Sequence, residues 1–401
     1  MKPKYQILAL IWLMMLVAYM DRVNIAVAAK VIMADLHFSK TEFGFVLSAF
    51  TVGYALLQAP GGLLADKVGS RKPLIAAILI WSLFTGLTGL AASFGSLILI
   101  RILFGVGEGI ENGAQFKLIG DHFNPLERSR ANAIFLTALP LGPLLASPLA
   151  VWLLAKEGWR TMFWSFAGLG LVVAVFLLLW LPREAPKRDT VREGLGPTLK
   201  KSGAKPTMVA YLLFNIAFWG FLGWIPTYLQ EQRHMALPQL GMLGTLPYVF
   251  GFVGLLVMGQ LGTSRLAGKR HRLVGSCYGL AAIFYVAASY APSGVLCVFA
   301  LSIAAFFLFG AFGPYWAIAL DLASPTHRGA FSGLVNFGGQ VGGVVGQITV
   351  GLLADKMKNF QGAFWFMAIA LGCGAMIMLS QAALGGIHSS KVQPLQPQGT
   401  E

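Results

Sequence analysis

Twelve runs of about 20 mostly apolar residues follow one another along this chain of 401 residues, and they constrain its fold more than any other feature. Such a run crosses a bilayer as a helix, whereas barrel strands would alternate over about 10 residues. Only 11% of the residues are charged, against about 25% in soluble domains. The sequence therefore predicts an all-α membrane protein with twelve transmembrane helices. The runs lie near residues 7–29, 43–65, 73–92, 95–116, 132–155, 161–181, 207–230, 241–262, 272–290, 294–320, 330–354 and 362–384.

The basic residues are distributed unevenly between the segments that connect these runs. The formal net charge is +14. With the N-terminus placed in the cytoplasm, seven of the 30 Lys and Arg residues fall in outside loops, and Arg22 and Arg101 fall within runs. The others lie in inside segments, as the positive-inside rule requires. The charge therefore predicts an inner-membrane protein with both termini cytoplasmic, which contacts membrane lipid and not nucleic acid.

One polar segment divides the runs into two sets of six. Residues 182–206 are rich in Pro, Gly and charged side chains, which is typical of a linker. We predict an N-terminal six-helix bundle over residues 1–181, a cytoplasmic linker over 182–206 and a C-terminal six-helix bundle over 207–386. The polar, Gln- and Pro-rich residues 387–401 predict a disordered cytoplasmic tail.

Short sequence echoes at an offset near 200 residues relate the two sets of runs. Pro-Leu-Glu-Arg-Ser at 125–129 corresponds to Pro-Thr-His-Arg-Gly at 325–329, and Phe-Trp at 163–164 corresponds to Phe-Trp at 364–365. Two parallel six-helix repeats can enclose a site at the bilayer midplane and rock about it. The echoes therefore predict two pseudo-symmetric bundles with alternating access.

A loop motif lies between the second and third runs. The sequence GLLADKVGSRK begins at Gly62 and has the pattern Gly, three residues, Asp, a basic residue, any residue, Gly, any residue and two basic residues. Asp66 at a helix end can bind a basic side chain or a neighbouring helix N-terminus, and Gly69 permits the turn. We interpret these residues, with Arg71, as a gating latch; the alternative is an ordinary basic loop. The equivalent segment 259–272 has no Asp.

Almost all charged side chains within the runs lie in the first half; in the second half, Asp321 lies at the end of a run. The first run contains Asp21 and Arg22, and the fourth contains Arg101, Glu108 and Glu111. A charge at membrane depth costs several kcal/mol unless it is paired or hydrated, so these residues indicate a functional site. Arg101 and Glu108 are two helical turns apart and share a face, with Glu111 close by.

Two interpretations of this cluster are open. In one, an arginine holds the carboxylate of an organic anion while a buried carboxylate takes up a proton. In the other, the charges form a structural salt-bridge network that holds the first and fourth helices together. Glu111 lies near the cytoplasmic end of its run, where hydration would stabilise its charge, and its role stays open.

Several segments resemble the anion:cation symporter family of the major facilitator superfamily, and the loop motif matches that superfamily's loop signature at every specified position. The family includes bacterial proton symporters for sugar acids such as galactonate, glucarate and hexuronates. Together the segments extend over most of the chain. They are YMDRVNIAVA (19–28), RILFGVGEG (101–109), FNPLERSRANA (123–133), WIPTYL (224–229) and NFGGQVGG (336–343).

The resemblance implies roles for individual residues. It implies that Asp21 and Glu108 are the proton-coupling carboxylates and that Arg101 pairs with them at the substrate site. The further substrate-binding positions that it implies are Arg22, Tyr54 and Asn336.

The chain departs from the family's pattern after Gly109. Ile110-Glu111-Asn112 stands where an aromatic-Pro-Ala step is usual, in a region that lines the cavity. The departure affects the substrate that can be expected and not the coupling residues.

Three further side chains are candidates for substrate contact. Tyr228 could contact a ligand, although interfacial and packing roles are more common for Tyr in membranes. Gln340 and Gln347 are polar at midplane depth and could hydrogen-bond a hydroxylated substrate, or join helices.

We therefore predict a secondary active transporter that imports an organic anion, such as a sugar acid or another carboxylate, by proton symport as a monomer. The sequence has no phosphate-binding loop, metal-ligand spacing or nucleophile–base pair, so we expect no enzyme, metal or cofactor, and an ion gradient as the energy source. Proton number, sodium coupling and the particular anion are left open.

Two rival functions are considered. A drug/proton antiporter would have a Gly-Pro-rich motif in the fifth run; Gly142-Pro143 is present, but Ala138 replaces the upstream glycine. A non-transporting membrane sensor would need a signalling domain, which the short tails do not offer.

Overall fold

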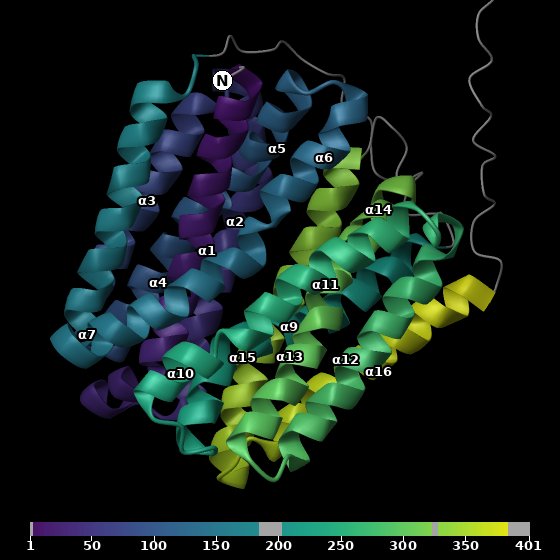
Figure 1. The fold of residues 1–401 in the computed structure, drawn as a ribbon. Helices are drawn as coiled ribbons and strands as arrows, with labels where there is room; N and C mark the ends of the chain where they lie inside the picture. The colour runs from purple at the N-terminus through teal and green to yellow at the C-terminus, as the bar shows by residue number, and fades with distance from the viewer. Residues whose placement is uncertain (1–2, 184–202, 323–327, 384–401) are drawn as a thin grey trace, which may run out of the picture.

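The computed structural model describes residues 3–183, 203–322 and 328–383, and all regular structure in these residues is helical (Figure 1). Most of the predicted linker and the predicted tail, residues 184–202 and 387–401, lie outside the described residues. The side chains of Asp66 and Arg328 are also outside them, although both residues belong to helices.

The first half of the chain folds into one bundle, coloured purple to blue in Figure 1. A Ser39–Glu42 capping box starts its second helix, and Asn124 followed by Pro125 starts its sixth; both patterns satisfy or avoid free N–H groups at a helix start. Its helices are α1 (Pro3–Leu36), α2 (Lys40–Val68), α3 (Arg71–Thr88), α4 (Phe94–Gly109), α5 (Glu111–His122), α6 (Pro125–Leu136) and α7 (Ala138–Trp180).

The second half folds into the neighbouring bundle, coloured teal to yellow. Its first helix begins at Ala204, inside the segment predicted as linker. Its helices are α9 (Ala204–Glu231), α10 (Leu237–Leu243), α11 (Leu246–Thr263), the short 3-10 helix η1 (Ala267–Lys269), α12 (Arg270–Tyr290), α13 (Gly294–Gly310), α14 (Phe312–Leu322), α15 (Arg328–Met357) and α16 (Gln361–Ala383).

Ten helical segments of the described chain are long and apolar enough to cross a membrane. The longest of these, residues 130–180, contains two predicted runs, because Gly158 adopts φ 79° and breaks the helix there. The fourth predicted run is divided at Ile110 into α4 and α5, each too short to be counted alone. When residues 130–180 are divided at Gly158 into two spans, and α4 and α5 are joined into one, the total is twelve spans. The predicted fold class is confirmed.

The outer surface of both bundles is apolar. Leu83, Leu179, Ile283 and Ile369 each expose more than half of their surface. Large exposed apolar surfaces of this kind are stable in lipid and costly in water. The polar and ionic side chains of the spans therefore turn inward.

The two bundles meet chiefly along an antiparallel pair, α2 and α15, with further contacts of α1 with α9 and of α7 with α10 and α11. Lys40 near the start of α2 contacts Asp355 near the end of α15, and Thr51 farther along α2 contacts Gln347. We call the end of the molecule with the α1–α2 turn (residues 37–39) the turn face, and the opposite end, with Pro3, the N-terminal face.

Candidate substrate and proton site

A buried ionic cluster lies in the first bundle where α1, α4 and α5 meet. Arg22 Nε donates to Glu108 Oε2 at 2.7 Å, and Arg22 Nη2 lies 3.6 Å from Glu111 Oε1. Both glutamates are fully buried. One guanidinium therefore faces two carboxylates in a region from which water is excluded, where charges interact more strongly than at a surface.

The structure places Glu111 in this cluster, whereas its role could not be assigned from the sequence. Glu111 is the first residue of α5, directly after the break at Ile110, and its Oε2 accepts a hydrogen bond from Gln115 Nε2 at 3.1 Å. The break turns the start of α5 toward Arg22. The expectation of a hydrated Glu111 near the membrane surface is therefore wrong, because the residue is fully buried against α1.

Aromatic rings surround the Arg22 guanidinium. Its Cζ atom lies 4.2 Å from the ring centroid of Tyr19, 4.9 Å from that of Tyr54, 5.5 Å from that of Phe50 and 6.0 Å from that of Trp219. Such contacts stabilise a cation without neutralising it. Trp219 belongs to α9, so this cage extends across the boundary between the halves.

Tyr54, implied by the resemblance as a substrate contact, is held in the cage by its hydroxyl group. Asn112 Nδ2 donates to Tyr54 Oη, which joins α2 to α5. Asn112 belongs to the segment that departs from the family pattern. The departure therefore alters side chains that fix the cage.

Arg101 makes no direct ion pair with Asp21 or Glu108, although Asp21 lies close enough for the two charges to interact. Its Nη2 donates to Thr88 Oγ1 at 3.2 Å, and its guanidinium lies against the rings of Phe104 and Phe163. No carboxylate of the described residues lies within 4.0 Å of it. Two helical turns place Arg101 about 10 Å along α4 from Glu108, whereas Arg22 reaches Glu108 from the neighbouring helix.

Asp21 lies beside this cluster with incomplete hydrogen bonding. Asn24 Nδ2 donates to Asp21 Oδ1 at 3.2 Å, and Asp21 Oδ2 has no partner within 3.5 Å among the described atoms, although the Thr85 hydroxyl lies near the carboxylate. Asp21 is 1% exposed. A buried carboxylate oxygen without a donor is a suitable place for a proton.

A small central cavity of about 20 Å³ between the halves is lined by both arginines. It has room for about one water molecule, so a sugar acid would fit only when the halves move apart. Its walls come from α1, α2 and α4 of the first bundle and from α9 and α15 of the second, so any ligand in it would touch both halves. Its polar lining consists of two guanidinium groups and an amide, which suits an anion that also carries hydroxyl groups. Its lining residues are Arg22, Ile25, Leu47, Phe50, Arg101, Phe104, Trp219, Leu222, Gly223 and Gln347.

Of the amide side chains on α15, one lines this cavity and two lie outside it. Gln347 lines the cavity, and its Oε1 accepts from Thr51 Oγ1 of α2 at 2.9 Å. Gln340 lies two turns away, where its Nε2 donates to Asn336 Oδ1 at 3.3 Å. Gln347 lines the cavity in this conformation, while Gln340 and Asn336 do not. The signal of Gln347 in the sequence was only its polarity within an apolar run.

Tyr228 lies away from the cavity, inside the second bundle. Its Oη accepts from Arg233 Nε at 2.6 Å, and its ring packs against Phe360 and Phe364. Arg233 also donates to three backbone carbonyls of residues 288–291. The structure therefore gives Tyr228 a packing role near the turn face and no place in the central cavity.

The predicted latch residues lie toward the N-terminal face. Gly62 faces Gly113 of α5, where a side chain on Gly113, and not one on Gly62, would collide with the other helix. Gly69 adopts φ 81° at the end of α2, and Arg71 Nη2 donates to the Leu178 carbonyl at 2.5 Å. The Asp66 side chain is outside the described part of the chain, so the latch stays a prediction.

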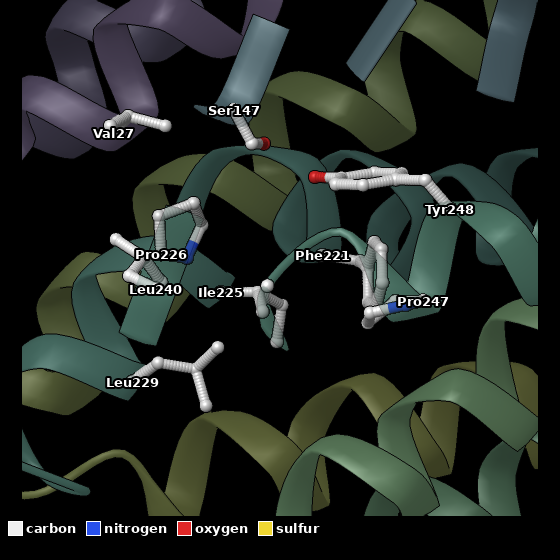
Figure 2. Close-up of a pocket in the computed structure, with 10 residues that line it drawn as sticks. Val27, Ser147, Phe221, Ile225, Pro226, Leu229, Leu240, Pro247 and Tyr248 are labelled. Carbon is white, nitrogen blue, oxygen red and sulfur yellow. The ribbon is translucent and has the colours of Figure 1, made fainter. Parts of the chain in front are cut away.

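A second cavity lies between the halves nearer the turn face. Val27 and Ser147 from the first half and residues of α9, α10 and α11 line it. Figure 2 shows the hydroxyl groups of Ser147 and Tyr248 directed toward each other across it, among apolar side chains. Its lining contains no charged residue, so the two arginines make the central cavity the candidate anion site.

Residues 11–347 match the Major Facilitator Superfamily. The chain belongs to that superfamily. Its fold is also that of a bacterial homologue of the human lysosomal transporter Spinster, solved in an inward-facing and unoccupied conformation, with a TM-score of 0.77, 19% identity and coverage of 95% of this chain and 96% of that one.

Curated relatives within the Major Facilitator Superfamily are transporters. The hexuronate transporter of Bacillus subtilis is 29% identical over 100% of this chain and 98% of its own length. The D-galactonate transporter of Escherichia coli O6:H1 is 28% identical over 92% and 94%. The quinolone resistance transporter of Acinetobacter baumannii is 27% identical over 98% and 96%. This chain is thus a multi-span membrane transporter related to sugar-acid transporters, and the prediction that it is no enzyme is confirmed.

Proposed function

We propose that this transporter imports an organic anion, in particular a sugar acid, by proton symport across a cell inner membrane, with both termini in the cytoplasm. The observation that carries the proposal is that Arg22 and Arg101 line one cavity between the two halves while the Glu108 carboxylate forms an ion pair with Arg22. The sugar-acid specificity is supported by the names of the hexuronate and D-galactonate relatives.

Competition for one guanidinium supplies the coupling. A substrate carboxylate and the Glu108 carboxylate both seek Arg22 Nε and Nη2, and two carboxylates at one buried cation repel each other. Protonation of Glu108 removes the competing charge and frees Arg22 for the substrate. Binding of the anion and binding of a proton therefore favour each other, which is the thermodynamic requirement for symport.

The balance of buried charge supports proton binding at this site. Asp21, Glu108 and Glu111 are three acids, while Arg22 and Arg101 are two bases, and all five are buried. An unbalanced charge in a membrane interior costs several kcal/mol. The cluster would reach neutrality by holding one proton before any substrate arrives.

The contacts between the halves support an inward-facing state. Among the described residues, the hydrogen bonds and ion pairs that join the halves lie between the level of Gln347 and the turn face. They are made by Lys40, Thr41 and Thr51 of the first half and by Gln230 of the second. With the N-terminus in the cytoplasm, the turn face is the outer one. In the proposed cycle the outward-open protein binds protons and the anion, and the inward-open protein releases both.

Uptake into proteoliposomes tests the proposal. Purified protein would be given labelled D-glucuronate, D-galactonate and D-glucarate with the lumen one pH unit more alkaline and the membrane potential held at zero. Each coupled proton then permits up to about tenfold accumulation. We expect accumulation of at least one acid that a protonophore abolishes. Glu108→Gln should abolish accumulation yet retain exchange of labelled for unlabelled acid, while Glu127→Gln, which alters a partly exposed pair with Lys4, should behave as wild type.

The name of the quinolone resistance relative from Acinetobacter supports one other candidate function, drug export. The same vesicles would be loaded with a quinolone. Proton-driven quinolone movement with no accumulation of any acid would overturn the symport proposal and identify an exporter. Accumulation of an acid with equal uptake by wild type and Glu108→Gln would retain the substrate and overturn the coupling residue.

A further inference from the structure

One hexapeptide occurs twice in the chain. Gly-Leu-Leu-Ala-Asp-Lys occupies residues 62–67, near the end of α2, and residues 351–356, near the end of α15. The first copy begins the predicted latch motif. The second copy lies at the opposite end of the molecule, because α2 and α15 run antiparallel against each other across the boundary between the halves.

This antiparallel arrangement brings the aspartate of the second copy to the start of α2. Asp355 Oδ1 accepts from the Lys40 backbone N–H at 3.2 Å, and Asp355 Oδ2 accepts from the Thr41 backbone N–H and hydroxyl, each at 2.6 Å. A carboxylate bound to the first N–H groups of a helix gains from both the charged hydrogen bonds and the helix dipole.

Asp355 completes a cap that α2 makes only in part by itself. The Ser39 hydroxyl accepts from the Glu42 N–H at 3.1 Å, and the Glu42 carboxylate accepts from the Ser39 N–H at 2.8 Å. This box leaves the N–H groups of the two residues between them without a partner from α2. Those are the two that Asp355 binds, so the N-terminal turn of one bundle is finished by a side chain of the other.

Close packing surrounds this contact. A side chain at Gly351 would collide with the Lys40 carbonyl, so glycine lets α15 approach α2. Lys40 Nζ also lies 3.1 Å from Glu231 Oε2 at the end of α9, and the Phe43 ring packs edge-on against Trp224. Each of these contacts joins one half to the other, and each must separate when the turn face opens.

We propose that Asp355 is a latch that holds the turn face closed, the counterpart at this face of the latch predicted around Asp66 at the other. When the turn face opens, Asp355 loses three hydrogen bonds and the Lys40 and Thr41 N–H groups become uncovered. Since the bonds exist only in the closed arrangement, they shift the conformational equilibrium toward it. The latch needs only two moving bundles and does not depend on which substrate is carried.

Distances between spin labels in the full chain test this without any substrate. One label pair would occupy Lys156→Cys and Lys358→Cys, exposed positions of the two halves at the turn face. A second pair would occupy Arg130→Cys and Lys269→Cys, exposed positions at the N-terminal face. Cys277 and Cys297 are buried, so only the half-buried Cys373 would be replaced, by alanine. Pulsed electron paramagnetic resonance in lipid nanodiscs would give the populations of short and long distances.

In Asp355→Asn we expect the open-to-closed ratio at the turn face to rise about tenfold, equal to about 1.4 kcal/mol. At the N-terminal face, the ratio of short to long distances between the second pair of labels should rise by the same factor. Thr41→Val removes one of the three bonds and should move the ratio in the same direction by about threefold, equal to about 0.65 kcal/mol.

Asp35→Asn is the matched control. Asp35 is an aspartate at the same face, but it binds Arg160 Nη1 at 2.6 Å and Trp159 Nε1 at 3.1 Å within the first half. Its removal should leave the ratio unchanged. The proposal would be overturned if Asp355→Asn and Thr41→Val gave the same ratio as Asp35→Asn, or if they lowered it. Because Thr41→Val keeps the charge, it decides the matter even if Asp355→Asn fails to fold.

Discussion

The two bundles have the same architecture but bury different chemistry. The first contains the five buried charges of the described spans, three of which form ion pairs where α1, α4 and α5 meet. The second contains stacked rings, such as Tyr211 on Tyr315 at 4.6 Å and Phe214 on Tyr278 at 5.0 Å, together with amides on α15. The difference indicates a division of work, in which the first half handles charge and protons and the second supplies shape and hydrogen bonds to the other side of the substrate.

The largest expected effect follows from replacing the cation at the centre of the first half. Arg22→Lys keeps the charge but loses the fork that reaches Glu108 and Glu111 together. We expect kcat/KM for exchange of the transported acid to fall by at least about 30-fold, since truncating a buried charged pair costs about 2–5 kcal/mol. Radiolabel exchange in proteoliposomes measures it. Exchange within fivefold of wild type would show that Arg101 alone holds the anion.

Glu111→Gln should act in the opposite direction. It removes the more distant of two carboxylates that compete with the substrate for Arg22. We expect KM to fall by about 3- to 10-fold at pH 7.5, because loss of a nearby like charge favours the anion by about 1 kcal/mol.

The change of KM with pH should also differ between Glu111→Gln and the wild type. Deprotonation of Glu108 and Glu111 weakens anion binding in the wild type, so KM rises with pH, and the rise should be shallower with one acid fewer. Uptake measured from pH 5.5 to 8.5 gives both values, with Glu127→Gln as the control. A higher KM would mean that Glu111 assists binding.

In the second half, Gln347→Leu should raise KM by about 5- to 10-fold with little change in kcat, since one hydrogen bond contributes about 1 kcal/mol. Gln347 also accepts from Thr51, so Thr51→Val separates the two roles: it breaks the contact between the halves and keeps the cavity amide. If Thr51→Val raised KM equally, Gln347 would act through the interface. Gln340→Leu, outside the cavity, should change KM by less than about twofold.

The smallest effect on transport is expected at Tyr228. Tyr228→Phe removes the acceptor of Arg233 Nε inside the second bundle and touches no wall of the central cavity. We expect transport within about twofold of wild type and a loss of about 1–2 kcal/mol of stability, the usual cost of leaving a charged donor unpaired. Thermal unfolding followed by tryptophan fluorescence tests the second value. A tenfold loss of transport with unchanged unfolding would restore Tyr228 as a substrate contact.

The sequence by itself determined the twelve spans, their division into two sets and the concentration of charge in the first half. These properties depend on the length and composition of continuous segments, which lipid selects residue by residue. The break at Ile110 and the turn at Gly158 changed the boundaries of two spans and left their number as predicted.

The tertiary structure decided which groups meet. Arg22, and not Arg101, binds Glu108; Glu111 joins the same guanidinium; Gln347 lines the cavity while Gln340 does not; and Asp355 caps a helix of the other half. Each pairing depends on the depth and rotation of one helix against another. Helical periodicity fixes which side chains share a face, but it does not fix what that face is packed against, and this is why the pairings could not be derived from the sequence.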